Sequence, residues 1–252
     1  MDFYLAAYTL WKREIVRFYR QPSRIIGALG TPLIFWIILG AGIGNISKTN
    51  YLAYFFPGTI VLVVFFTAIF STFSIIDDRK EGFLQSVMVA PVSRGAIVMG
   101  KILGGATLAF IQGIIFLIFA KSAGAQFEVL PLVKLLIALF LISFAMTAMG
   151  FVLAWRMDST QGFHAIMNLF LMPMWLVSGA VFPFFNAPIW LKILLMLNPL
   201  TYGVAGIRWG LYPQSNQVLH IPTFNVCAIV LVGVGFILYL ISSISVAKAK
   251  RA

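Results

Sequence analysis

Long apolar runs alternate along most of this chain with short segments that carry charges, prolines and glycines. Since a helix of about 20 apolar residues crosses the hydrocarbon core of a bilayer, each long run predicts a membrane-spanning helix. The pattern predicts six spans, at residues 25–44, 55–76, 96–120, 132–155, 165–181 and 224–246. We therefore expect an all-α membrane protein with a single transmembrane domain over residues 1–252.

The first segment, residues 3–21, predicts an amphipathic helix that lies on the membrane surface. Basic residues recur on one face and mostly aromatic residues on the other: Arg13, Arg17, Arg20 and Arg24 against Tyr8, Trp11, Ile15 and Phe18. We expect the basic face to contact lipid head groups and the aromatic face to contact the acyl boundary. The alternative is a juxtamembrane tail whose cations only set the topology.

A charged segment, residues 77–94, separates the second and third spans and begins with DDRKE. It predicts a short helix with Phe83, Leu84, Val87 and Met88 on one apolar face. Proline disfavours helix in the residue before it, so Ala90-Pro91 ends this helix. Ser93 is then a candidate cap for the third span. The apolar face either docks a partner protein or packs on the chain's own spans, and the sequence favours neither.

The region 182–222 contains two apolar segments of eleven residues, PIWLKILLMLN and LTYGVAGIRWG, separated by Asn198-Pro199. Each is too short to cross a bilayer, so we expect re-entrant short helices on the outer side. The aromatic residues of the region are placed as an interfacial belt would be: Phe182, Phe184, Phe185, Trp190, Tyr202, Trp209 and Tyr212. A rival interpretation joins residues 188–212 into a seventh span.

Composition and charge support the membrane assignment. Apolar residues make up 61% of the chain and charged residues 10%, where soluble domains average about 45–50% and about 25%. The net charge of +11 comes from Lys and Arg beside the apolar runs, which indicates membrane topology rather than nucleic-acid binding. With six spans, thirteen of the 18 Lys and Arg fall on the side of the N-terminus. The positive-inside rule then places both termini in the cytoplasm.

The segment Gly95–Lys101 matches the phosphate-binding pattern G-x4-G-K, but Ile102 stands where that motif has Ser or Thr. We interpret the segment as the start of a helix in which Gly100 and Gly104 allow a second helix to approach closely. We expect no ATP site in this chain.

Other catalytic patterns are missing from the sequence. His164 and His220 have no Cys, His or carboxylate partners at metal-ligand spacing, so we predict no metal site and no catalytic residues. No carboxylate lies in the middle of a predicted span, which argues against a transporter driven by protons or sodium. We interpret the loop carboxylates as solvated charges.

Two groups of residues resemble the type-2 ABC exporter permeases. The first comprises Asp78–Gln85, Val89–Arg94 and Met99–Lys101, and resembles the family's signature after the second span. The second lies near the C-terminal end and comprises Phe182-Pro183, Pro188, Trp190-Leu191, Asn198–Tyr202 and Arg208. Phe83 and Gln85 depart from the family's usual Thr and Glu.

The resemblance implies a homodimeric permease in a bacterial-type inner membrane. Two copies of a separate cytosolic ATPase would bind ATP and Mg²⁺, dock on the interfacial helix and the short helix, and power export. The implied coupling residues are Asp78, Arg79, Glu81, Gly82, Phe83, Leu84, Val87, Pro91 and Arg94, with Trp11, Arg13, Arg17 and Arg20 on the interfacial helix. Amphipathic, lipid-like or lipid-linked cargo is expected, and polysaccharide or haem export is the alternative within the class.

The alternative outside the class of ATP-driven exporters is a passive channel or scaffold subunit, which would need no energy source. Four residues of the fifth span are candidates either to line a transport pathway or to pack against other helices: Phe170, Met172, Met174 and Trp175.

Overall fold

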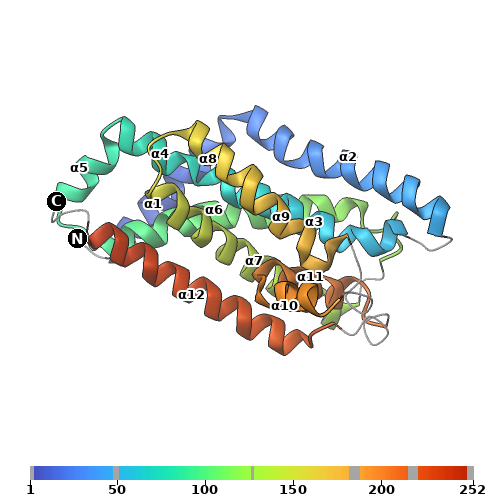
Figure 1. Cartoon of the computed structure of the whole chain (residues 1–252). Helices are drawn as coiled ribbons and strands as arrows, with labels where there is room; N and C mark the ends of the chain where they lie inside the picture. The colour runs from blue at the N-terminus through green and yellow to red at the C-terminus, as the bar shows by residue number, and fades with distance from the viewer. Residues whose placement is uncertain (1–2, 48–50, 126–127, 182–187, 215–220, 249–252) are drawn as a thin grey trace.

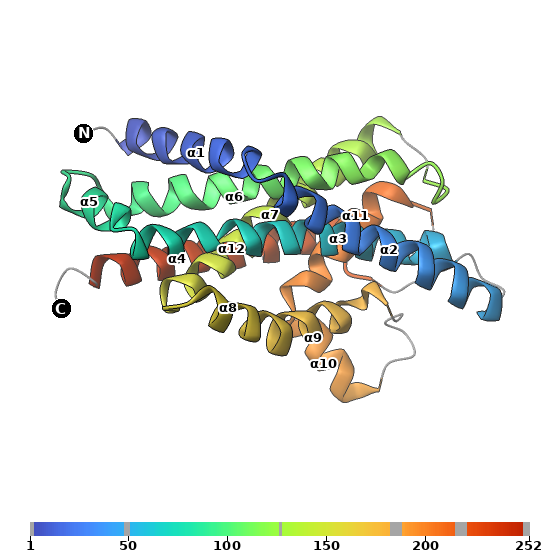
Figure 2. The same ribbon diagram turned by 90° about the horizontal axis from the view of Figure 1, so that it is seen from above.

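In this computed structural model, the regular elements of the described residues are all helical; these residues are 3–47, 51–125, 128–181, 188–214 and 221–248. The helices form an elongated bundle whose long axis is horizontal in Figures 1 and 2. Within the described residues, six helical segments are long and apolar enough to cross a membrane, which is the predicted number; the bent pair Ile189–Leu197 and Pro199–Leu211 would make seven if it forms one broken span.

The elements follow the predicted order, with most boundaries within a few residues. They are α1 (Phe3–Tyr19), α2 (Pro22–Ser47), α3 (Tyr51–Ser71), α4 (Phe73–Lys80), α5 (Phe83–Val89), α6 (Arg94–Phe116), α7 (Val129–Trp155), α8 (Thr160–Ile166), α9 (Met172–Trp175), α10 (Ile189–Leu197), α11 (Pro199–Leu211) and α12 (Phe224–Lys248). Short 3-10 or π segments are η1 (Leu117–Phe119), η2 (Met167–Leu171) and η3 (Leu176–Ala180).

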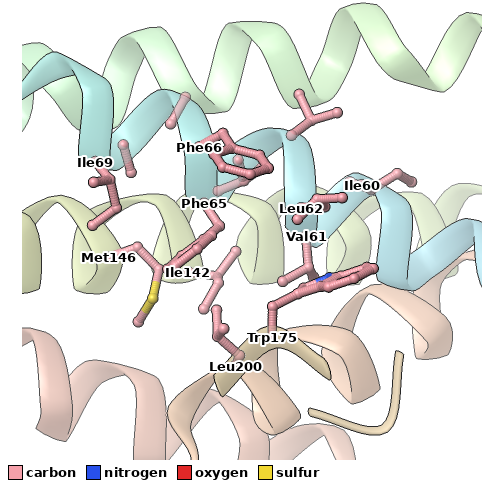
Figure 3. Packing of buried hydrophobic residues seen from close by; sticks show 14 of the residues in the cluster. Ile60, Val61, Leu62, Phe65, Phe66, Ile69, Ile142, Met146, Trp175 and Leu200 are labelled. Carbon is pink, nitrogen blue, oxygen red and sulfur yellow. The ribbon is translucent and has the colours of Figure 1, made fainter. Parts of the chain in front are cut away.

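Helix α3 forms the centre of the bundle. It is hydrophobic on all sides, and such a helix is buried rather than amphipathic. Figure 3 shows Phe65 of α3 pointing toward Ile142 and Met146 of α7. Trp175 of α9 packs against α3 and donates a hydrogen bond from Nε1 to the carbonyl oxygen of Gly58, at 3.0 Å.

Helices α3 and α4 form one candidate span, Tyr51–Lys80, interrupted only at Thr72. The predicted span stops at residue 76, before the charges. The helix instead continues through Asp77, Asp78 and Arg79, because these side chains have ionic or hydrogen-bonding partners on neighbouring helices. The charged residues therefore extend the span by one turn before the chain turns at Glu81 and Gly82.

Helix α1 lies lengthwise against the first half of α6 (Figure 2). The small residues of α6 make this contact, as the Gly100 and Gly104 spacing predicts. A Cβ at Gly100 would lie 2.6 Å from the carbonyl oxygen of Ala7, and a Cβ at Gly104 would lie 2.6 Å from Cβ of Glu14. The buried face of α1 includes Ala7 and Glu14; of the aromatic face that the sequence predicts, Phe18 is buried as well, whereas Tyr8 is exposed.

The second half of the chain contains two breaks. Gly179 in η3 has a φ of 77°, a backbone conformation that favours glycine, and ends the segment that begins with α8. Helices α10 and α11 meet at an angle of 82° at Asn198, which confirms the predicted division into two short helices. The aromatic residues predicted at 182, 184 and 185 lie outside the described residues, as does His220.

Helix α1 begins, and α12 ends, at the end of the bundle that also carries α5 (Figure 1). This arrangement agrees with an even number of crossings. The assignment of this end to the cytoplasm stays a prediction from the charge distribution.

Candidate functional site: a buried ion-pair network beside helix α5

Asp78 is the centre of a charged cluster in which α1, α4 and α6 meet. Its side chain has 0% exposure. Both terminal nitrogens of Arg13 donate to its two carboxylate oxygens at 2.8 Å, and Arg17 donates to Oδ1 at 2.8 Å. The hydrogen bond to Asp78 raises the pKa of Arg13 above its ordinary value. Lys101 of α6 donates to Oδ2 of the same carboxylate, the oxygen that also accepts from Arg13 Nη1.

Glu14 and Asp77 complete this cluster, which we call the ion-pair network: Arg13, Glu14, Arg17, Asp77, Asp78 and Lys101. Lys101 Nζ lies 2.6 Å from Glu14 Oε1, and Arg17 Nη2 lies 3.1 Å from Asp77 Oδ2. Three cations therefore balance three carboxylates. Such balance matters because an unpaired charge in a buried site costs several kcal/mol, about 3–5 when one partner of a buried pair is removed.

The network corrects two expectations from the sequence. Arg13 and Arg17 were expected to face lipid head groups, but they bind carboxylates of α4. Asp78 and Glu14 were expected to be solvated, but both are buried. The physical reason is the close contact of α1 with α6, which brings the basic face of α1 over the end of α4. The location of α1 at the membrane surface stays a prediction.

Lys101 was not predicted as a site residue, although the sequence carries a signal for it. An ionisable residue inside a predicted span usually faces a partner within the bundle, and Lys101 lies inside the predicted span 96–120. The structure shows a helix from Arg94 onward, capped by the Ser93 hydroxyl as predicted, and Lys101 is occupied by Glu14 and Asp78.

Helix α5 is joined to the network through its first residue. The guanidinium carbon of Arg13 lies 3.8 Å from the centre of the Phe83 ring, a cation–π contact. Gly82, with a φ of 76°, makes the turn that sets the direction of α5. Leu84 is only 2% exposed, so this side chain anchors α5 on the protein itself.

The surface that α5 leaves free differs from the predicted apolar face. Val89 is 86% exposed, and Glu81, Gln85 and Ser86 are exposed as well. Phe83, Val87 and Met88 are half-buried. For Leu84, and in part for Phe83, the packing interpretation is therefore the correct one, and a partner would meet the outer ridge of the helix.

Two further predicted coupling residues hold the surroundings of α5 in place. Arg79 Nη1 donates to the carbonyl oxygen of Trp155 at 2.5 Å, and Nη2 lies 3.4 Å from Asp158 Oδ1. Arg94 Nη2 donates to the carbonyl oxygen of Met88 at 2.9 Å. Arg79 thus connects α4 to the end of α7, and Arg94 connects α6 to α5. Pro91 is exposed in the connection between α5 and α6.

The remaining predicted residues are dispersed. Trp11 donates from Nε1 to Thr107 Oγ1 at 3.0 Å and so contributes to the α1–α6 contact. Arg20 is exposed at the end of α1, where it stays a candidate for lipid contact.

The four candidate pathway residues lie on one broken span but in different surroundings. Trp175 is 2% exposed and hydrogen-bonded in the core, as the packing alternative expects, and its role in a pathway stays a prediction. Met172 and Met174 are half-buried against the same core, and Phe170 is exposed on the bundle surface.

Arg208 is a buried cation at the other end of the bundle. The sequence did not predict that this side chain is buried. It was assigned to an outer segment, but it lies under Tyr54, with its guanidinium carbon 4.4 Å from the ring centre. It also donates to the carbonyl oxygen of Tyr54 at 3.0 Å. This contact secures α11 against α3.

Within the described residues, no group of three His, Cys, Asp or Glu could hold a metal ion. The ion-pair network carries no free carboxylate positioned for catalysis. Its ion pairs instead hold α1, α4 and α6 together, and the contact of Arg13 with Phe83 joins these three helices to α5. A displacement of α5 would therefore act on α1, α4 and α6 together.

An apolar helical bundle with six candidate spans and a charged, helix-bearing end defines a polytopic membrane protein. The family model for ABC-2 type transporters matches residues 6–212 of this chain, which include the network, α5 and α11. The chain therefore belongs to the ABC-2 type transporter permease family.

Named relatives agree with this membership. The chain is 32% identical over 230 residues to ycf38 of Cyanophora paradoxa, which is named as a transport permease; the match covers 86% of this chain and 78% of the relative. It is 27% identical to nodulation protein J of Rhizobium leguminosarum bv. viciae, with coverage of 84% and 85%. It is 23% identical to the inner membrane transport permease YadH of Escherichia coli K12, with 91% of each chain covered.

Proposed function

We propose that this chain is the membrane subunit of an ATP-driven exporter, powered by a separate ATPase that docks on α5. The observation that carries the proposal is the contact of Arg13 with Phe83, because it joins the helix exposed at the end of the bundle to the ion-pair network. Family membership supports the same function, since ABC-2 permeases work with an ABC ATPase in general.

The exposed ridge of α5, with Gln85, Ser86 and Val89 facing outward, is the proposed docking surface, and Glu81, exposed in the turn before the helix, is proposed to belong to it. The internal face, with Phe83 and Leu84, is the proposed transmission surface. Docking and transmission are thus assigned to opposite faces of one seven-residue helix. ATP and Mg²⁺ would be bound by the partner, and two ATPase copies would serve a homodimer of this chain in the inner membrane with both termini cytoplasmic.

Amphipathic, lipid-like or lipid-linked molecules are the proposed cargo. The six apolar candidate spans support this class, because a pathway between such helices offers apolar side chains and few charges. The short helices α10 and α11 are proposed to enter the membrane from the outer side and return.

The docking surface can be tested by purifying the chain together with its ATPase. We expect Val89→Glu to reduce the co-purified ATPase strongly, because it puts a charge in place of the exposed apolar side chain at the last position of α5. Val129→Glu is the matched control. Val129 is also an exposed valine at a helix terminus, but it is the first residue of α7 and lies away from α5. Full ATPase recovery with Val89→Glu would contradict docking on this ridge, and absence of any ATPase from the wild-type preparation would favour a channel or scaffold subunit.

A further inference from the structure

A cleft of about 280 Å³ opens between α4, α5 and the turn that follows α7, and neither Arg13 nor Phe83 is among its lining residues. Its apolar wall is formed by Ile76, Leu84, Met88, Trp155 and Met157. Ile76 and Leu84 are buried and form its floor, whereas Trp155 and the two methionines are half-buried at its sides. Three separate elements enclose the cleft, so it is a built feature rather than a gap beside one helix.

The polar rim of the cleft carries an excess of positive charge. Arg79 and Lys80 supply two cations, and Asp158 supplies the one carboxylate among the lining residues. Asp158 is 93% exposed and lies 3.4 Å from Arg79, which therefore has a partner. Within the described part of the chain, Lys80 makes no ion pair and is exposed, so its charge is available to a ligand.

The position of the cleft along the bundle places it at the level of lipid head groups. The span Tyr51–Lys80 has 30 residues, which at about 1.5 Å per residue is about 45 Å. This length matches a bilayer with its head-group regions, about 40–45 Å, so Lys80 at its end lies outside the hydrocarbon. Trp155 at the end of α7 lies at the same level, where tryptophan is enriched in membrane proteins.

We propose that this cleft binds an anionic amphiphile: its acyl chain contacts the wall formed by Met88 and Trp155, and its phosphate or carboxylate contacts Lys80. The cleft has an apolar floor beneath a cationic rim. A lipid in the adjacent leaflet has its acyl chain and its head group in the same order along the membrane normal. The inference rests on the proposed function in one respect: it takes the bound amphiphile to be the cargo of the exporter or a molecule that resembles this cargo. The cleft then provides the first contact of cargo with the exporter, beside the helix that the ATPase moves.

The emission of Trp155 offers a direct test on the purified full-length chain without ATPase. The probe is dodecyl phosphate brominated on its chain, and the signal is the quenching present in wild type and missing in Trp155→Phe. We expect saturable quenching by this probe and none that saturates with a brominated dodecyl trimethylammonium of the same chain length.

Charge variants decide whether the head group is recognised. Lys80→Glu should weaken binding of the alkyl phosphate about tenfold or more, since each Lys or Arg near a surface attracts anionic lipid appreciably. Asp158→Asn should strengthen binding severalfold, because it removes the carboxylate of the rim. Lys121→Glu is the matched control, since Lys121 is also exposed but follows α6 at the other end of the bundle.

Three results would overturn the proposal: equal quenching by both probes, unchanged binding in Lys80→Glu, or an effect of Lys121→Glu as large as that of Lys80→Glu. If only the co-purified ATPase changes Trp155 emission, the cleft is a protein docking site and the amphiphile proposal is wrong. Because the probe assay contains no ATPase, its failure leaves the co-purification test of α5 docking unaffected, and the two proposals can fail separately.

Discussion

The guanidinium group of Arg13 stacks on the ring of Phe83 at 3.8 Å while both of its terminal nitrogens bind the buried carboxylate of Asp78. One side chain thus connects the short helix α5 to a network that includes α4 and α6. The same arginine contributes to charge balance in the network and to the position of α5.

Phe83→Ala is expected to impair transport while leaving the ATPase bound. The substitution removes the ring beneath Arg13 but does not alter the exposed ridge of α5. A cation–π contact is worth about 0.5–2 kcal/mol, so we expect transport per ATP hydrolysed to fall several-fold. Transport and ATPase activity in reconstituted vesicles would measure this ratio.

Phe83→Tyr is the matched variant, because it keeps an aromatic face for Arg13 and should retain coupling. Equal coupling in the Ala and Tyr variants would show that the ring does not transmit the movement. Replacing Glu81 together with Phe83 should affect both docking and transmission, since Glu81 is exposed in the turn before α5 whereas Phe83 packs against Arg13.

Lys101→Met is expected to destabilise the folded protein by about 3–5 kcal/mol, because it leaves Glu14 and Asp78 with one cation fewer in a buried site. Thermal unfolding in detergent would show a lowered midpoint. The double variant Lys101→Met with Glu14→Gln removes one charge of each sign, so we expect it to cost less than the sum of the two single changes.

Lys121→Met serves as the control for the loss of a lysine, since Lys121 is exposed. An unfolding midpoint of Lys101→Met equal to that of this control would contradict the structural role of the network.

Gly100→Ala is expected to displace α1 from α6. Its new Cβ would lie 2.6 Å from the carbonyl oxygen of Ala7 and 3.1 Å from Cα of the same residue, and backbone atoms cannot rotate away. Overpacking of this kind costs about 1–3 kcal/mol. We expect a lower unfolding midpoint, whereas Gly27→Ala, where a Cβ meets no atom within 4 Å, should leave the midpoint unchanged or raise it.

Features that depend on residues close together in the chain could be predicted from the sequence, and features that depend on distant residues could not. The six candidate spans, the cap at Ser93 and the break at Asn198 depend on residues close together in the chain, and these predictions are confirmed. The partners of Arg13 and Lys101 depend on contacts between residues 23 to 87 positions apart. A basic face on a helix looks the same in sequence whether it meets head groups or carboxylates.

The surroundings of the interior residues also could not be predicted from the sequence. Trp175 lies in an apolar run, and apolar side chains in a membrane protein can face lipid, a pathway or other helices with no difference in pattern. In the structure, its 2% exposure and the hydrogen bond of its indole to Gly58 distinguish it as a core residue. Arg208 carried a stronger signal, since a cation within a short apolar segment calls for a partner, but Tyr54 could not be identified from its sequence position.

The topology of α10 and α11 can be resolved by cysteine labelling, because Cys227 is the only cysteine of the chain and is buried. Two new cysteines, at Ile189 before the bend and at Gln214 after it, test the re-entrant interpretation; both positions are exposed. If the pair enters from the outer side and returns, an impermeant maleimide added outside intact cells should label both. Val89→Cys on α5 should react only after the membrane is opened. Labelling of Ile189→Cys from one side and Gln214→Cys from the other would instead establish a broken seventh span, and the C-terminal end of α12 would then lie on the opposite side of the membrane from the N-terminus.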